Sequence, residues 1–170
     1  YTAYIGQDQE AKVKSITVNQ NNPGSSNRVS ASMKISALKN HNFYKVRVRA
    51  YSLNSKNEKI YGVWSSWKYV SPQPDVTKIK NNKSKKGIQI SWDKMNGADR
   101  YVVYVSTKKD SGYKKFQTTG KNSTTITKYG KNKLKSGKTY YFYVVAQKKV
   151  NDKYMSGTAG NATKRWSLTY

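Results

Sequence analysis

Two segments of the chain share a pattern that constrains the fold more than any other feature of the sequence. The segment from Leu134 to Ala146 places a tyrosine six residues after its leucine and then has apolar side chains at every second position. The segment from Leu38 to Ala50 repeats this order. Because successive side chains of a strand point to opposite faces, a period of two predicts strands with one buried face. The pattern therefore predicts two related β units.

Further segments rich in β-branched and aromatic residues lie along both halves of the chain, separated by turn residues. In the first half they span 1–6, 11–19, 29–35, 44–51 and 61–70; in the second half they span 76–80, 87–92, 101–106, 113–119, 123–127, 134–146 and the C-terminal residues. None has a convincing period of 3.6, and short strands at regular spacing indicate an all-β sandwich. Ser71–Pro74 contains two prolines and predicts a short, stiff linker between domains 1–71 and 72–170.

Three motifs in the second half point to one kind of sandwich. They are an Ile-x-Ile-x-Trp strand (Ile88, Ile90, Trp92), a Gly-Ala-x-x-Tyr strand entry (Gly97, Ala98, Tyr101) and a tyrosine corner (Leu134, Gly137, Tyr140). Together they resemble fibronectin type III domains, of the lysine- and tyrosine-rich kind found on secreted and surface proteins of Gram-positive bacteria. The resemblance implies two tandem immunoglobulin-like β-sandwiches. It covers residues 72–170 nearly end to end.

The resemblance implies a structural role for the tyrosine corners. In such a corner the phenol ring packs in the core while its hydroxyl bonds to the upstream backbone. The first half has the corresponding Leu38 and Tyr44, with His41 in the position of the glycine Gly137. We interpret His41 as a surface residue of the turn.

The first half matches the family only from the third strand, strand C, onward. Residues 1–6 correspond to 101–106, so strands A and B have no counterpart in residues 1–71. A sandwich without these strands exposes its core and an unpaired sheet edge. We expect the natural chain to extend upstream. The alternative is that another chain donates the strands, which would make the protein a subunit of a surface filament or polymer.

Trp64 and Trp67 are the most suggestive local feature. Residues three apart in a polyproline II strand share a face, so both indoles can lie over the neighbouring strand. The outward positions of that strand are Lys45, Arg47 and Arg49. A stabilising ladder of cations and indoles is the favoured interpretation. A sugar-binding platform is the alternative, because tryptophans in line can also stack on sugar rings.

The net charge of +25 comes from 28 lysines, 5 arginines and only 8 acidic residues. Such a charge attracts polyanions within about a Debye length, roughly 8 Å at physiological salt. The loop residues Lys83, Lys85 and Lys86 are candidate polyanion contacts. Specific nucleic-acid recognition is not expected, since base reading favours arginine and stacking aromatics.

The sequence offers little for catalysis or metal binding. Cysteine is absent and His41 is the only histidine, so we expect no enzyme activity, no cofactor and no metal site. No apolar run approaches the roughly 18 residues that a membrane span needs.

The resemblance implies a non-enzymatic spacer or adhesion module, secreted or at the cell surface. Its partners would be other domains of the same polypeptide, neighbouring subunits, or anionic cell-wall polymer or glycan. The alternatives are the strand-donating subunit described above and an accessory module of a carbohydrate-active enzyme.

Overall fold

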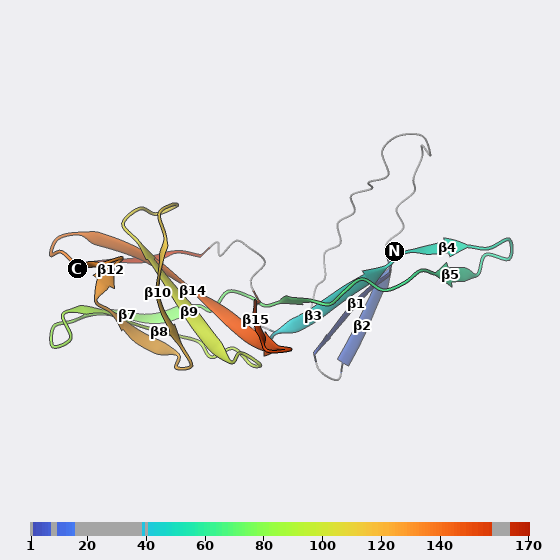
Figure 1. The fold of residues 1–170 in the computed structure, drawn as a ribbon, viewed down its shortest axis with the longest axis horizontal. Helices are drawn as coiled ribbons and strands as arrows, with labels where there is room; N and C mark the ends of the chain where they lie inside the picture. The colour runs from blue at the N-terminus through green and yellow to red at the C-terminus, as the bar shows by residue number, and fades with distance from the viewer. Residues whose placement is uncertain (1, 8–9, 16–38, 40, 158–163) are drawn as a thin grey trace. The chain divides into compact units, whose positions relative to one another are not determined.

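The computed structural model describes residues 2–7, 10–15, 39, 41–157 and 164–170 (Figure 1). Every regular element in this part of the chain is a β-strand, and the paired strands are antiparallel. The predicted all-β fold class is confirmed. None of the described segments is a helix that could span a membrane.

The chain divides into two compact units. The first comprises Tyr1–Lys39 with Tyr44–Lys68, and the second comprises Asn40–Phe43 with Tyr69–Tyr170. The predicted domain boundary between residues 71 and 72 stays a prediction.

Two antiparallel sheets build the second unit. One sheet has the order β10–β9–β14–β15, with β16 also paired to β14. Its strands are β9 (Arg100–Ser106), β10 (Lys114–Thr119), β14 (Thr139–Val150), β15 (Lys153–Ser156) and β16 (Trp166–Thr169). The other sheet has the order β11–β8–β7, from β7 (Val76–Asn82), β8 (Gly87–Trp92) and β11 (Ser123–Ile126). A two-residue pair, β12 (Lys128–Tyr129) with β13 (Asn132–Lys133), follows β11. In Figure 1, β9 lies between β10 and β14.

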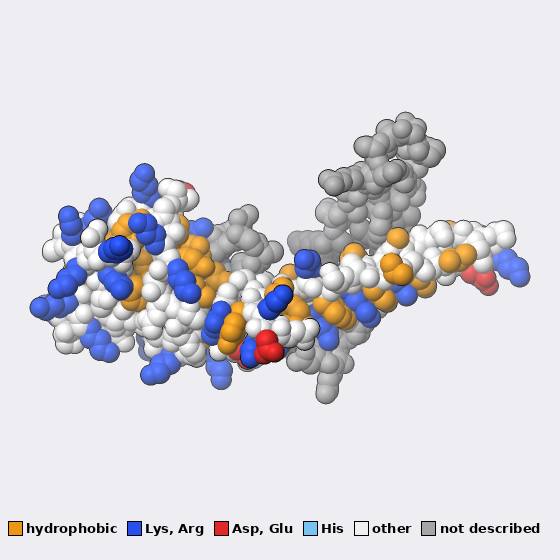
Figure 2. All heavy atoms as spheres, in the orientation of Figure 1, with side chains coloured by type: hydrophobic (Ala, Val, Ile, Leu, Met, Phe, Trp, Pro, Cys, Tyr) orange, Lys and Arg blue, Asp and Glu red, His pale blue; other side chains and the backbone are white. Residues whose placement is uncertain are grey.

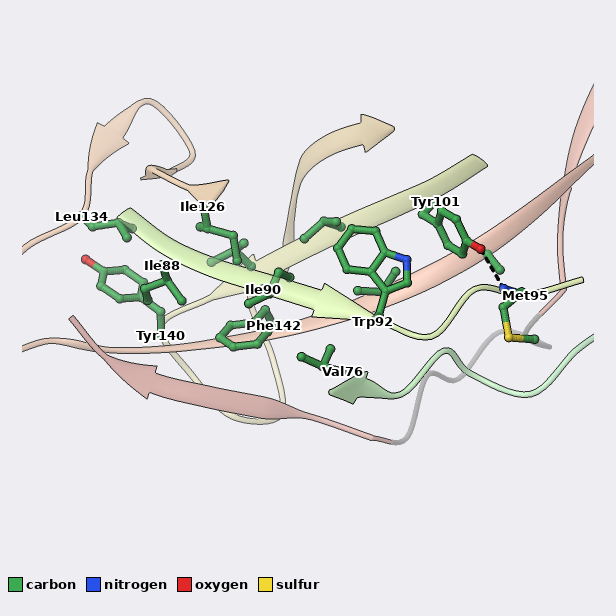
Figure 3. Packing of buried hydrophobic residues seen from close by; sticks show 14 of the residues in the cluster. Val76, Ile88, Ile90, Trp92, Met95, Tyr101, Ile126, Leu134, Tyr140 and Phe142 are labelled. Carbon is green, nitrogen blue, oxygen red and sulfur yellow. Dashed lines mark hydrogen bonds between the residues drawn. The ribbon is translucent and has the colours of Figure 1, made fainter. Parts of the chain in front are cut away.

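Alternating side chains of the two sheets form one core, which makes this unit a β-sandwich. Ile88, Ile90 and Trp92 of β8 are almost fully buried, as are Phe142 and Val144 of β14. They belong to one hydrophobic cluster with side chains from β7, β9 and β11 (Figure 3). Burying such side chains contributes about 1.5–3 kcal/mol each. The alternation therefore fixes which face of each strand points inward.

Tyr101 closes one end of this core. Its hydroxyl accepts a hydrogen bond of 2.8 Å from the backbone N–H of Met95, drawn as the dashed line in Figure 3. Its ring meets Trp92 edge-on, with 5.4 Å between the ring centroids. Burial raises the pKa of the Tyr101 hydroxyl, and the Met95 bond opposes that rise only in part. The phenol therefore stays neutral at physiological pH.

The first unit repeats the larger of the two sheets. Its sheet has the order β2–β1–β3, from β1 (Thr2–Gln7), β2 (Glu10–Ser15) and β3 (Tyr44–Arg49). The short strand β6 (Lys68–Val70) begins at the last residue of this unit. β4 (Tyr51–Leu53) and β5 (Lys59–Tyr61) form a separate hairpin.

The two units share one strand register. Ala3 pairs with Val48 as Val103 pairs with Val144, and Ile5 pairs with Val46 as Val105 pairs with Phe142. The alignment of residues 1–6 with 101–106 therefore extends to the strand pairing itself.

The inward faces of these matching sheets differ in burial. In β14, Val144 is fully buried under the second sheet of its unit. Its counterpart Val48 in β3 is 43% exposed, and Ala50 is exposed as well. Within the described residues of the first unit, the only other sheet is the two-stranded β4–β5 hairpin. The predicted strand at 29–35 lies outside the described residues.

The tyrosines of the repeated motif make the same backbone contact in both units. The Tyr140 hydroxyl accepts a 2.9 Å hydrogen bond from the N–H of Lys135. The Tyr44 hydroxyl accepts a 2.8 Å bond from the N–H of Lys39 and lies 3.2 Å from its carbonyl oxygen. Both rings are buried, and so is Leu134, whereas Leu38 lies outside the described residues.

The turn before each tyrosine requires a left-handed residue. Gly137 has φ of 74° and His41 has φ of 63°, at equivalent positions of the motif. Glycine adopts this conformation without steric cost, whereas a side chain at the same φ is strained.

Some predicted boundaries need correction. The alternating strand expected from Tyr140 to Ala146, after the turn that follows Leu134, begins at Thr139 and continues to Val150, because Gln147–Val150 pair with β15. The strand expected at 44–51 is interrupted after Arg49, where β4 begins a separate hairpin.

Replacing Tyr140 with phenylalanine keeps the buried ring but leaves the N–H of Lys135 without its acceptor. We expect Tyr140→Phe to lower the free energy of unfolding by about 1–2 kcal/mol, measured by urea denaturation followed by circular dichroism. The matched control is Tyr141→Phe, which changes the neighbouring, outward-facing ring and should shift the free energy by less than about 0.5 kcal/mol. Equal effects of the two variants would contradict the assigned role of the hydroxyl.

Candidate functional site

The outward face of β3 carries a ladder of alternating cations and aromatic rings. The cations are Lys45, Arg47 and Arg49, which recur at every second position and so share one face of the strand. The rings come from the segment that follows the β4–β5 hairpin. The structure brings all five side chains of the predicted ladder together.

Distances within the ladder show how each cation is placed. The guanidinium carbon of Arg47 lies 4.3 Å from the Trp64 ring centroid and 4.4 Å from that of Trp67. Arg49 lies 4.3 Å from Trp64, and Lys45 Nζ lies 4.9 Å from Trp67. All are within the roughly 6 Å range of cation–π attraction.

These distances put a cation on both faces of each indole. Residues two apart on a strand are roughly 7 Å apart, since each residue rises about 3.4 Å. Arg47 and Arg49 are each 4.3 Å from Trp64, so its ring lies between them. Trp67 lies between Arg47 and Lys45 in the same way. The ring faces that would stack on a sugar are therefore occupied by the protein's own cations.

Sequence reasoning missed one member of the ladder. The Arg49 guanidinium carbon also lies 3.5 Å from the ring centroid of Tyr61. Tyr61 ends β5 and pairs across the hairpin with Tyr51, at 6.1 Å between ring centroids. Its position depends on the hairpin register, which the spacing of Trp64 and Trp67 does not reveal.

Ser65 fixes the tryptophan segment to β3. Its backbone N–H donates to the Val48 carbonyl at 2.8 Å, and its hydroxyl accepts from the Val48 N–H at 3.0 Å. The serine hydroxyl thus replaces the backbone acceptor that a regular strand would offer. Residues 62–67 form no regular strand, which fits the extended segment that places both indoles on one face.

The second unit has a similar cluster of cations and aromatic rings, but here the strand supplies the ring and another segment supplies the cation. Arg47 pairs with Tyr4 across the strands as Tyr143 pairs with Tyr104, so Tyr143 takes the place of Arg47. Here the cation comes from the last segment of the chain. The Arg165 guanidinium carbon lies 4.5 Å from the Tyr143 ring centroid.

Stacked tyrosines complete this cluster. Tyr104 and Tyr143 stack with 4.9 Å between ring centroids and 16° between planes, and Tyr113 meets Tyr143 at 4.8 Å. Burial raises the pKa of the Tyr113 and Tyr143 hydroxyls, so both stay neutral at physiological pH. The sequence pattern did not single out this cluster, because Arg165 and Tyr143 are far apart in the chain.

The candidate polyanion contacts Lys83, Lys85 and Lys86 are exposed in the turn between β7 and β8. The Oδ1 atom of Asn82 holds this turn. It accepts a 2.8 Å bond from the Ser84 hydroxyl and a 3.0 Å bond from the Lys85 N–H. The three lysines therefore project from a turn of defined shape.

His41 was interpreted as a surface residue, and its side chain is 42% exposed. Its Nε2 atom also lies 3.1 Å from Asp93 Oδ2. Within the described residues, no three histidine or acidic side chains lie close enough together to hold a metal ion.

The ladder predicts that removing different cations lowers the stability of the protein by different amounts. Arg47→Met keeps a side chain of similar length but removes the cation between two rings, and should cost about 1–2 kcal/mol of stability. Lys45→Met removes a cation that contacts one ring and should cost about half as much. Urea denaturation followed by tryptophan fluorescence measures both. An Arg47→Met effect no larger than that of Lys45→Met would contradict the ladder.

Comparisons with known proteins give a likeness among solved structures and no family. No family model matches the chain, and no curated protein matches it. Among solved structures, the crystal structure of a Fn3-like protein from Clostridium thermocellum is similar, with 25% identity over 51% of this chain and 84% of that chain, and a TM-score of 0.40. This score is too low to carry an argument, so the fold rests on the sheets described above.

Proposed function

We propose that the protein is a non-enzymatic spacer or adhesion module of a secreted or surface-attached bacterial protein, held near anionic wall polymer by its positive surface. One observation carries the proposal, namely that the excess of positive charge is not neutralised within the molecule. The chain has 33 cationic and 8 acidic residues. Figure 2 shows Lys and Arg side chains spread over the visible face of the second unit rather than gathered at one spot.

The acidic side chains are mostly engaged locally. In the described part of the chain, Asp75 pairs with Lys164 at 2.6 Å, Asp152 with Lys149 at 2.8 Å and Asp93 with His41. Asp99 accepts a hydrogen bond from the Lys149 backbone. These contacts leave the lysine excess facing solvent, where it can attract a polyanion.

The expected behaviour is salt-sensitive retention on Gram-positive cell walls. Binding that releases counterions weakens steeply as salt rises. We expect the protein to bind isolated walls at low salt, to elute as salt rises, and to be lost from walls stripped of anionic polymer. Retention that is unchanged across the titration, or equal on stripped walls, would contradict the proposal.

A second candidate function is supported by the exposure of Val48 on the inward face of β3. Val48 is 43% exposed where its counterpart in the second unit is fully buried. Strands from another chain could cover such a face, which would make the protein a polymerising subunit.

This second candidate predicts self-association. Sedimentation and sizing of the native chain should then show assemblies that grow with concentration. Val48→Lys places a charge on the open face and should reduce them, while Val63→Lys, at a residue that is 92% exposed, should not. A monomer at all concentrations, with a well-protected first unit, would exclude strand donation.

The third candidate, an accessory module of a carbohydrate-active enzyme, needs free indole faces on Trp64 and Trp67. Cations occupy those faces in the ladder, so the geometry does not favour it. Replacing both tryptophans with alanine should then leave polysaccharide retention unchanged.

A further inference from the structure

The outer face of the smaller sheet of the second unit contains a groove with a cationic lining. The groove has a volume of about 570 Å³ and runs along β7 and β8. Its lining residues are Thr77, Lys78, Ile79, Lys80, Gln89 and Ser91.

The strand register explains why these side chains meet. Ile79 pairs with Ile90, which points into the core, so their neighbours point outward. Lys78 lies opposite Ser91 and Lys80 lies opposite Gln89 on that outward face. The register shifts between Val76 and Lys78, and such a bulge bends an edge strand and redirects its side chains.

All charged side chains that line the groove are positively charged. Lys78 and Lys80 are exposed, and none of the lining residues is acidic. Asp75 directly precedes β7, and its carboxylate is paired with Lys164 at 2.6 Å. The positive charge of the groove is therefore not neutralised by acidic side chains of its own lining.

The turn at the end of β7 extends this surface. It carries Lys83, Lys85 and Lys86 and is held by Asn82, whose Nδ2 also donates to Gln89 Oε1 at 3.1 Å. One strand and its turn thus present five lysines in succession.

The spacing of the lysines indicates the form of the ligand. Lys78 and Lys80 are two residues apart on one strand, so their backbone positions are roughly 7 Å apart. A series of cations along a line suits a series of anions along an extended chain, whereas a single small anion would be held better by converging donors.

The remaining lining residues indicate its chemistry. The Ser91 hydroxyl and the Gln89 Nε2 amide can bond to hydroxyls of a polyol. The Thr77 hydroxyl, by contrast, donates to the Ser91 carbonyl, and Gln89 Oε1 accepts from Asn82. The lining has no aromatic ring on which a base could stack and no arginine for bidentate reading of a base. A nucleic acid is therefore a poorer match than a polymer of alternating phosphate and polyol.

We propose that the β7–β8 groove binds a linear phosphodiester polymer of polyol units, with Lys78 and Lys80 contacting successive phosphates. This inference rests on the proposed function and names the site and the ligand class for it. The lysines of the β7–β8 turn continue the same track.

The test compares two variants of equal net charge, using poly(glycerol phosphate) as the probe and titrating it into the full chain. Lys78→Gln with Lys80→Gln removes two groove lysines. Lys128→Gln with Lys133→Gln removes two exposed lysines that pair across β12 and β13 and do not line the groove. A variant with arginine at 78 and 80 keeps the charge. Circular dichroism and urea denaturation check that all variants fold.

We expect the groove variant to bind on the order of tenfold more weakly near 0.1 M salt, with the slope of log K against log salt reduced by about 1.4, because two phosphate contacts are lost. The control variant should change by less than about twofold, and the arginine variant should bind as well as the wild type.

Each other outcome overturns a stated part of the account. Equal weakening of the groove and control variants means that net charge alone attracts the polymer, which refutes the site and leaves the proposed function standing. Failure of the unmodified chain to bind the polymer or walls refutes both. Tighter binding of a single-stranded oligonucleotide, with the same dependence on Lys78 and Lys80, refutes the ligand class.

Discussion

The pairing of β9 with β14 is the interaction on which the rest of the second unit depends. It sets Val103 opposite Val144 and Val105 opposite Phe142, and all four are buried. A slip of one residue would turn these side chains outward, so burial fixes the register.

The remaining strands follow from that register, because β10 joins β9 while β15 and β16 join β14. The first unit uses the same register between β1 and β3, yet Val48 is 43% exposed there. The units therefore share one sheet plan and differ in how its inner face is covered.

On the outer face of this sheet, both units pair cations with aromatic rings. The two units differ in whether the strand supplies the cation or the ring. In the first unit the strand supplies Arg47 and the following segment supplies Trp64 and Trp67. In the second, the strand supplies Tyr143 and the last segment supplies Arg165. In both units the aromatic rings and the cations make cation–π contacts with one another. These faces therefore stabilise the sheet rather than remain open to a ligand. The polyanion site that we propose lies accordingly on the other sheet of the second unit, where the groove lysines are exposed.

Much of the fold could be predicted from the sequence, because the alternation of apolar and polar residues along a strand indicates which side chains are buried. The strand predicted at 87–92 has the same bounds as β8. The predicted contacts of Trp64 and Trp67 with Arg47 are present in the structure. Features that depend on long-range register could not be predicted. Tyr61 enters the ladder through a hairpin, and the groove lies beside the register shift between Val76 and Lys78. Neither leaves a periodic signal in the sequence.

Amide hydrogen exchange on the monomeric chain tests most directly the claim that the inward side chains of this sheet plan are buried in the second unit and partly exposed in the described strand β3 of the first. Amides in covered core strands exchange only on global opening, whereas poorly packed strands exchange by local opening. The account predicts strong protection at Val103, Phe142 and Val144, and much weaker protection at Val46 and Val48. Equal protection of the two sets in a monomer would show that the inner face of the first unit is covered, and would contradict the account.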